Sequence, residues 1–151
     1  MIKIICFGKI KEKYLLDAID DYKRRLSKYT KVVIVELCDE CDKNVDNALS
    51  REYDRVMKHI SLKDNLVMLD LLGKSYTSVQ FSNFIEKELV YSSNITFLIG
   101  SSNGFDRRLC DLVKKKVSFS SLTFPHGLFR VILLEQIYRG FKIINNETYH
   151  K

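Results

Sequence analysis

The chain of 151 residues has no tryptophan, one proline and only six glycines. This scarcity of glycine and proline excludes collagen-like and linker-rich architectures. No stretch approaches the ~20 consecutive apolar residues of a membrane helix, so we expect no membrane span and no membrane partner. The apolar run at the start, Met1 to Gly8, lacks the ordered regions of a signal peptide, which favours a cytoplasmic protein.

Cysteine and histidine are too sparse and too scattered to indicate a metal site. Of the four cysteines, Cys38 and Cys41 form a CxxC, but no second CxxC and no histidine pair accompanies it. We therefore expect a surface loop there and no metal. His59 falls on the polar side of a predicted helix, where we expect a solvated side chain.

What remains is a globular composition with a basic bias. The hydrophobic fraction is 46%, the charged fraction 29% and the formal net charge +6, and the length predicts a single domain over 1–151. The charge is uneven. Residues 1–31 hold nine basic and four acidic residues, 36–54 hold two and seven, and 106–151 hold nine and four. Two basic ends around an acidic middle favour a polyanionic partner.

Strand and helix patterns alternate along the chain. Apolar runs predict strands at 2–7, 32–37, 65–70 and 95–99. Spacings of three and four predict helices at 12–29, at 45–60 and after a cap at Thr77 or Ser78. This order predicts a three-layer α/β domain, with a mostly parallel sheet and helices on both faces. Ligands of such sheets bind beyond the carboxyl ends of the strands, so we expect a site in the turns after Asp70, after Ile99 and after 117–123.

The turn from Leu98 to Asp106 contains Gly100 and Gly104, which let a ligand approach the backbone closely. It is neither GxGxxG nor a phosphate-binding loop with Gly-Lys-Ser/Thr, and this disfavours a nicotinamide enzyme of the Rossmann type. Arg107 and Arg108 follow it and, with the lysines at 114–116, make a basic cluster. Such a cluster is either a solvated helix end or a phosphate-contacting patch.

The segment 118–139 is the most unusual part of the sequence. Hydroxyl residues lead into Phe-Pro-His at 124–126 and then into a run of helix length at 128–138 that is apolar nearly all round. A helix without a polar face is buried on every side, so we expect it to pack against a second protomer. Glu135 and Arg139, four residues apart, are expected to form a local ion pair. For His126, a helix N-cap and a catalytic role remain two open interpretations.

Taken in order, these segments resemble the RlmH family, the SPOUT-class methyltransferases that modify N3 of a pseudouridine in the large ribosomal subunit. The resemblance rests on Ile-Lys-Ile-Ile-Cys-Phe-Gly at the start and on Leu-Ile-Gly-Ser-Ser-Asn-Gly at 98–104. It rests above all on the C-terminal part: Ser-Phe-Ser-Ser-Leu-Thr-Phe-Pro-His at 118–126, the helix from Arg130 to Arg139, and Tyr-His-Lys at 149–151. The match covers the whole chain.

The resemblance implies a C-terminal trefoil knot, a homodimer with its active site at the interface, and S-adenosylmethionine as cofactor. The substrate implied is a pseudouridine in helix 69 of 23S ribosomal RNA, within the assembled ribosome. Carried over by position, the cofactor-binding residues are Leu69, Gly100, Phe119, Ser120, Ser121, Leu122, Thr123 and Phe124. We expect the catalytic residues to be His126, Arg130, Tyr149 and His150. We expect RNA contacts from Arg139, Lys151, Arg107 and Arg108.

Two positions depart from the family pattern. Ser101 stands where a second glycine is common, and Lys151 stands where some relatives have arginine, which loses a bidentate phosphate contact. Two other functions fit the same features: a knotted methyltransferase acting on transfer RNA, and a ribosome-associated RNA-binding protein without catalysis.

Overall fold

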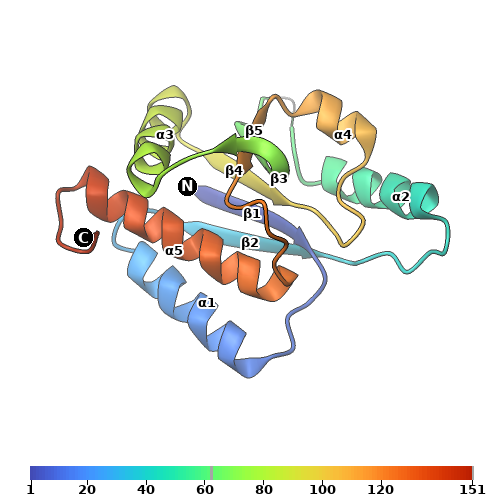
Figure 1. Ribbon diagram of the computed structural model, residues 1–151, viewed down its shortest axis with the longest axis horizontal. Helices are drawn as coiled ribbons and strands as arrows, with labels where there is room; N and C mark the ends of the chain where they lie inside the picture. The colour runs from blue at the N-terminus through green and yellow to red at the C-terminus, as the bar shows by residue number, and fades with distance from the viewer. Residues whose placement is uncertain (62, 151) are drawn as a thin grey trace.

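The computed structural model describes residues 1–61 and 63–150, which form one five-stranded sheet with five helices packed around it (Figure 1). The strands are β1 (Ile2–Phe7), β2 (Val32–Leu37), β3 (Leu66–Ser75), β4 (Ile95–Ile99) and β5 (Lys115–Ser118). The helices are α1 (Lys13–Leu26), α2 (Val45–Met57), α3 (Ser78–Tyr91), α4 (Arg107–Leu112) and α5 (His126–Ile144). The strands pair in the order β2-β1-β4-β3-β5, all parallel, which confirms the predicted α/β fold.

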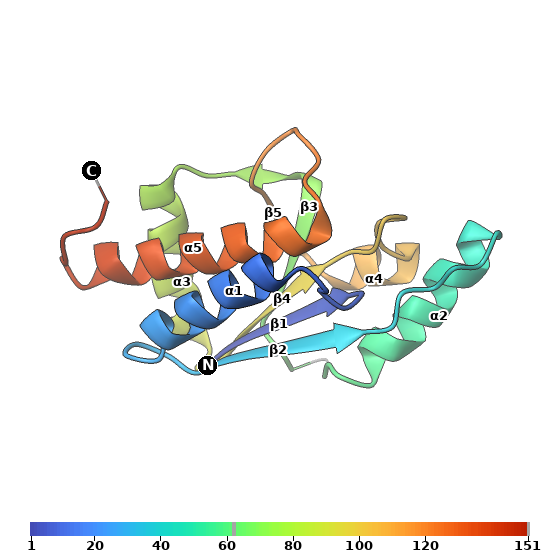
Figure 2. The ribbon, with the colours of Figure 1, turned by 90° about the horizontal axis from the view of Figure 1, so that it is seen from below.

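Alternate residues of each strand face opposite sides of the sheet. On β1, Ile4 and Cys6 point into an apolar cluster formed with α1, α3 and α5, whereas Ile5 and Phe7 point into a second cluster formed with α2 and α4. Figure 2 shows α1 and α5 lying together along one side of the sheet. Both faces are therefore covered, as the three-layer prediction requires.

Local signals explain most element boundaries. The strands predicted at 2–7, 32–37 and 95–99 have those bounds in the structure. Thr77, not Ser78, caps α3. Its hydroxyl accepts a hydrogen bond from the Gln80 amide (3.2 Å), and the Gln80 side chain accepts one from the Thr77 amide (2.9 Å). The first two helices are shorter than predicted, and α5 is longer than the run at 128–138.

Strand β3 extends beyond its predicted end because it pairs with β5 twice. Val117 pairs with Leu69 and again with Lys74, so residues 70–73 bulge out between two contacts with the same partner. Gly73 lies directly on the backbone of β5 at this bulge. A Cβ there would stand 2.6 Å from the backbone nitrogen and carbonyl carbon of Val117, which only glycine avoids. The trefoil knot implied by the resemblance is not tested by these pairings and stays a prediction.

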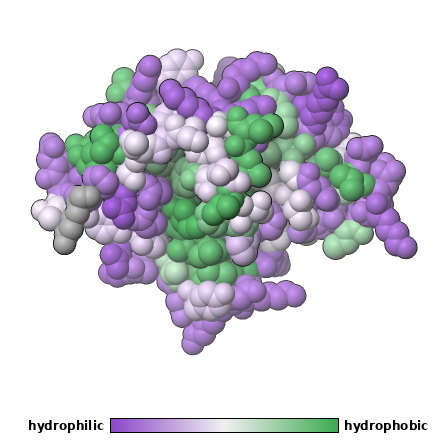
Figure 3. All heavy atoms as spheres, viewed as in Figure 1, coloured by the Kyte–Doolittle hydropathy of each residue, from purple (hydrophilic) through white to green (hydrophobic). Residues whose placement is uncertain are grey.

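Within one chain, helix α5 is buried on one face; the expected burial of its other face against a second protomer is not tested by these contacts and stays a prediction. Leu133, Leu134 and Ile137 pack into the larger cluster, between α1 and α3. Leu128, on the outer surface, keeps 40% of its area exposed. In Figure 3 apolar side chains gather over α5 and between α5 and α1 on the same face of the molecule. The helix thus has intramolecular partners on its inner face and an apolar outer surface toward its N-terminal half.

Candidate active site

A cavity of about 710 Å³ opens at the bulge of β3 and at the carboxyl ends of β4 and β5, at the edge at which the sheet order predicts a ligand site. Strand β3 contributes the bulge that follows Leu69, and β4 and β5 each contribute the turn that follows the strand. The volume lies within the ~300–1,000 Å³ of pockets that enclose drug-sized ligands. The lining residues are Leu69, Asp70, Leu71, Leu72, Ile99, Gly100, Ser101, Ser102, Gly104, Phe105, Cys110, Val117, Ser118, Phe119, Ser120, Leu122, Thr123, Phe124, His126 and Phe129.

Seven of the eight expected cofactor-binding residues line this cavity. They are Leu69, Gly100, Phe119, Ser120, Leu122, Thr123 and Phe124. The eighth, Ser121, is exposed and lies outside the lining. The structure thus brings the three predicted turns together, although their lining residues come from positions as far apart as 69 and 129 in the chain. Whether these residues bind a cofactor stays a prediction.

The turn after β4 is held in place by its own backbone. Ser101 and Gly104 bond to each other through both amides, at 3.2 and 3.0 Å. Gly100 lies beneath this turn, and a Cβ there would stand 2.8 Å from the Gly104 carbonyl oxygen. A larger residue at position 100 would therefore force the turn at 101–104 to shift. Gly100 also lines the cavity, so a ligand there can contact its backbone directly.

The cavity wall is apolar and hydroxyl-rich, with a negative charge and no fixed positive charge. Asp70 lines it, whereas none of the lining residues found within 1–61 and 63–150 is lysine or arginine. The Asp70 carboxylate also accepts a hydrogen bond from the Leu72 amide at 2.9 Å, which orders the turn after Leu69. Such a wall favours an uncharged or cationic ligand over a phosphate-bearing one, because phosphate sites need positive partners.

Two residues expected to be catalytic begin α5 but have different environments. His126 is the first residue of the helix and lines the cavity. Pro125, not His126, occupies the N-cap position, so the N-cap interpretation of this histidine is wrong. Arg130, one turn later, does not reach the cavity.

Arg130 is 2% exposed and holds the ends of β1 and β2 instead. Its guanidinium donates to the carbonyl oxygens of Phe7 and Gly8 and to the Glu36 carboxylate (2.6 Å). In this position the guanidinium is not accessible to an RNA phosphate. The nearby positive charge also acts on Cys6, but burial is the larger effect and raises the pKa of that thiol to about 11. Arg130 therefore fixes the first turns of α5 against the sheet.

The other expected catalytic residues, Tyr149 and His150, follow the C-terminal end of α5. The Tyr149 hydroxyl donates to Glu135 (3.1 Å), and the Arg139 guanidinium lies 4.8 Å from the centre of the Tyr149 ring. Arg139 also pairs with Glu135 at 2.5 Å, which confirms the predicted ion pair, and its Nη1 is 3.3 Å from His150 Nδ1. The structure thus brings Arg139, Tyr149 and His150 into one cluster. Arg139 and His126 are thirteen residues apart on one helix, about 20 Å.

Glu147 anchors the tail that carries this cluster. Its carboxylate accepts hydrogen bonds from Lys142 (2.6 Å), the Tyr29 hydroxyl (2.8 Å) and Lys28 (3.2 Å). The Lys142 ammonium, followed by the Tyr29 hydroxyl and Lys28, lowers the pKa of the Glu147 carboxyl to about 2. The backbone turns back at Asn146, which has a positive φ of 53°. The position of the tail is therefore set by ionised groups.

Replacing Glu147 by glutamine is expected to lower stability at neutral pH and to have little effect in acid. The folded-state pKa lies below the ordinary 4.5, so this group stabilises the fold above pH 4.5 and loses that contribution as the pH falls toward 2. Urea denaturation of both proteins at several pH values measures this difference. The control is Glu86→Gln, an exposed carboxylate of α3. A difference between wild type and Glu147→Gln that stays constant from pH 7 to pH 2 would contradict the anchor.

Arg107 and Arg108, which were expected to contact RNA, lie outside the cavity. Arg107 is exposed at the start of α4. Arg108 pairs with Asp106 (2.9 Å) and lies 4.1 Å from the centre of the Tyr53 ring. Lys151 falls outside the described residues. Within those residues Cys38 and Cys41 are exposed free thiols, no group of ligands suits a metal ion, and no helix could cross a bilayer.

Comparison with known proteins assigns the chain to a family. The family model described as "Predicted SPOUT methyltransferase" matches residues 1–150, nearly the whole chain. The chain belongs to the SPOUT methyltransferase family. The family resemblance inferred from the C-terminal motifs is thereby confirmed.

Curated relatives are similar in sequence to this SPOUT methyltransferase along their full length. The proteins named "Ribosomal RNA large subunit methyltransferase H" from Caldicellulosiruptor bescii and Clostridium botulinum (strain Hall) are 45% and 48% identical to it, over 100% and 99% of both chains. A protein from Methanococcus maripaludis named "Putative ribosomal RNA large subunit methyltransferase H" is 45% identical over 99% of both chains. A solved structure titled "a probable methylase family protein" from Haemophilus influenzae shares the fold, with a TM-score of 0.55 at 14% identity, over 99% of this chain and 70% of that one.

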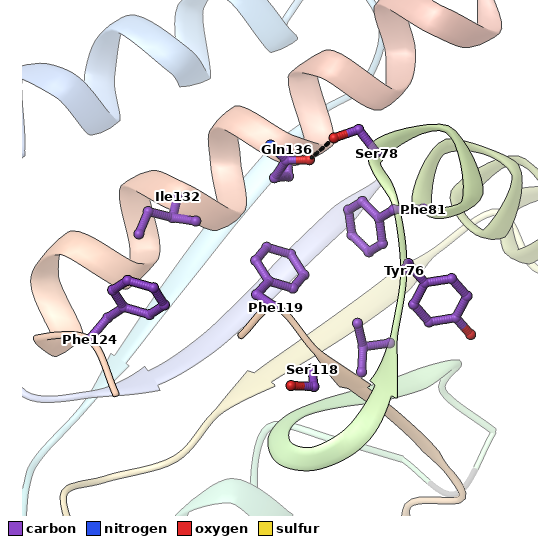
Figure 4. Close-up of a pocket in the computed structure, with 9 residues that line it drawn as sticks. Tyr76, Ser78, Phe81, Ser118, Phe119, Phe124, Ile132 and Gln136 are labelled. Carbon is purple, nitrogen blue, oxygen red and sulfur yellow. Dashed lines mark hydrogen bonds between the residues drawn. The ribbon is translucent and has the colours of Figure 1, made fainter. Parts of the chain in front are cut away.

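Several residues of the SPOUT methyltransferase cavity were not anticipated individually. Asp70 and Ser101 belong to segments where the strand pattern predicts a ligand site. Their position in the sequence could therefore have identified them. Cys110 and Phe129 come from α4 and α5, and no local pattern distinguishes them from core residues. Tyr76 and Gln136, which line a second, smaller cavity (Figure 4), carried no signal at all.

Proposed function

We propose that this chain transfers a methyl group from S-adenosylmethionine to N3 of a pseudouridine in helix 69 of 23S ribosomal RNA, within the assembled ribosome in the cytoplasm. The observation that carries the proposal is the cavity at the β3 bulge and the ends of β4 and β5, built from segments that the family resemblance assigns to the cofactor. The names of the full-length relatives support ribosomal RNA as the substrate.

The residues of the cavity fit S-adenosylmethionine better than a dinucleotide. The ligand is a sulfonium cation with an adenine ring and ribose hydroxyls. The wall offers apolar side chains, serine and threonine hydroxyls, and Asp70, and none of its described residues is lysine or arginine. The backbone of Gly100 and the segment 119–124 would hold the adenosine part. When bound, the cofactor supplies an electrophilic methyl group and needs no metal.

The protein then has two tasks: to orient the base and to accept its N3 proton. Orientation supplies much of the rate because the methyl group is already activated. His126 is the histidine of the cavity wall and can act as the proton acceptor there. His150 is the second candidate, at the other end of α5.

The separation between cavity and tail supports a homodimer. Arg139 lies about 20 Å along α5 from His126, and His150 lies beside Arg139, so the tail is too far from His126 to act on the same substrate atom within one chain. A partner docked on the apolar outer surface of α5 can bring its own tail to this cavity. Tyr149 and His150 of each chain then complete the other chain's site, with Arg139, Lys151, Arg107 and Arg108 available to RNA phosphates.

Isothermal titration calorimetry with S-adenosylmethionine tests the cofactor part of the proposal. We expect saturable binding by the wild type and at least tenfold weaker binding by Gly100→Val, because the added side chain displaces the turn at 101–104. The control is Gly127→Ala, whose Cβ would meet only side-chain atoms, the end of Leu15 and two carbons of Ile10. No detectable binding by the wild type at millimolar cofactor would contradict an enzyme and favour a non-catalytic RNA-binding protein.

Methyl incorporation from labelled cofactor distinguishes the substrates. We expect label in the large-subunit RNA of purified ribosomes and none in transfer RNA. Label in transfer RNA alone would instead identify the chain as a knotted methyltransferase of that second class.

A further inference from the structure

Three lysines stand on the connection between β1 and α1, which we call the lysine loop (residues 8–13). Lys9, Lys11 and Lys13 are all exposed. Within residues 1–61 and 63–150 none of the three forms an ion pair, whereas Lys28, farther along the same basic segment, pairs with Glu147 at 3.2 Å. The lysine loop therefore carries a local positive charge that the described part of the chain does not neutralise.

The lysine loop is held against the first turns of α5. Ile10 packs against the larger apolar cluster, and a Cβ at Gly127 would stand 3.6 Å from the Ile10 side chain, so the loop touches the residue that follows His126. The buried Arg130 guanidinium donates to the carbonyl oxygen of Gly8 at 2.8 Å. Figures 1 and 2 both show the connection between β1 and α1 passing the start of α5. The three lysines are thus fixed beside the histidine of the cavity wall.

Lysine is an unfavourable choice at this end of a helix. The helix dipole places a partial positive charge at the N-terminus, where acidic side chains are stabilising and basic ones are not. The first turn of α1 holds no acidic residue and begins with Lys13, and Glu12 at the N-cap position forms no side-chain cap. Helix α2, by contrast, has Asp46 in its first turn. The lysines therefore do not serve the stability of α1, and a bound polyanion would remove their repulsion.

We propose that the lysine loop is an RNA-binding surface, whose ammonium groups contact phosphates next to the target base; this rests on the proposed function. None of the described residues that line the cavity is lysine or arginine, so the phosphates that flank a base in the cavity need cations outside it. The lysine loop supplies such cations beside His126. Lysine contacts a phosphate as a point charge and reads no base, so the loop positions the RNA strand and does not select its sequence.

The test removes the three charges together, in the variant Lys9→Gln/Lys11→Gln/Lys13→Gln. Ribosome binding without cofactor is measured over a range of salt concentrations, and methylation kinetics are measured at one of them. We expect the slope of log K against log salt concentration to fall by about two, because each phosphate contact to a single strand contributes about 0.7. We expect KM for ribosomes to rise by about tenfold or more, with kcat and the affinity for S-adenosylmethionine unchanged.

The matched control is Lys43→Gln/Lys58→Gln/Lys87→Gln, which removes three charges from exposed positions beside α2 and on α3. We expect this control to keep the wild-type KM and most of the wild-type salt slope. Equal losses in both variants would overturn the inference, because net charge and not the lysine loop would then attract the ribosome. An unchanged salt slope in the loop variant would overturn it too, as would a fall in kcat at constant KM.

Urea denaturation of the loop variant separates binding from folding. We expect stability at least equal to that of the wild type, since the substitutions remove like charges from the positive end of α1. A less stable variant would show that the lysines support the fold and would overturn the inference. A wild type that binds ribosomes with the expected salt dependence but transfers no methyl group overturns the proposed function instead, and the binding measurements still decide the role of the lysine loop.

Discussion

Gly73→Ala is expected to abolish cofactor binding and to destabilise the fold more than any other single methyl addition described here. The new Cβ would stand 2.6 Å from the backbone nitrogen and carbonyl carbon of Val117, and neither atom can move without breaking the pairing of β3 with β5. Overpacking a well-filled site costs about 1–3 kcal/mol, occasionally more, of a total stability of about 5–15 kcal/mol. Here we expect the upper end, since the obstacle is backbone.

If β5 is displaced, the segment from Val117 to Phe124 moves with it, and this segment lines both cavities. Urea denaturation and calorimetry with S-adenosylmethionine measure the two effects. Gly127→Ala is the matched control, because its Cβ would meet the end of the Leu15 side chain at 2.8 Å and no backbone atom. We expect this control to bind cofactor normally. A Gly73→Ala protein with wild-type stability and cofactor affinity would contradict the described contact between β3 and β5.

Mixing two inactive variants is expected to restore about a quarter of the wild-type activity. Gly100→Val damages the cavity, and His150→Ala damages the tail, so neither homodimer methylates ribosomes efficiently. Random reassortment gives half heterodimers, and each heterodimer has one intact cavity facing one intact tail, which leaves about a quarter of all sites complete. The measurement is methyl transfer to ribosomes after subunit exchange.

This mixing experiment has two controls. Each variant alone must stay inactive, and exchange must be verified by differently tagged chains. If activity does not return although heterodimers form, the tail and the cavity act within one chain, and the proposed dimer geometry is wrong. If His150→Ala alone is fully active, the tail has no chemical role.

Much of this fold was predictable because its signals are local. The apolar runs of β1, β2 and β4 have the predicted bounds, and Thr77 begins α3 as a cap should. The far end of β3 was not predictable, since Lys74 and Ser75 are strand residues only through their pairing with β5, more than forty positions later. Long-range pairing leaves no trace in the local pattern.

The cavity was partly predictable for the same reason. Leu69, Gly100 and the segment 119–124 follow predicted strands, and this position predicts that they take part in a ligand site. In the structure they line one cavity. Arg130 shows the limit of this reasoning. Its motif suggested chemistry, yet its side chain is buried against Phe7 and Gly8. Which way a side chain points from a helix start depends on how that helix docks, and no local pattern contains this information.

Mass spectrometry of ribosomal RNA from a strain that lacks the gene tests the central claim most directly. We predict that one pseudouridine of the large-subunit RNA loses its methyl group. The wild-type gene restores it and the Gly100→Val gene does not. Unchanged ribosomal RNA in the deletion strain, or a methyl group missing from transfer RNA instead, would contradict the account.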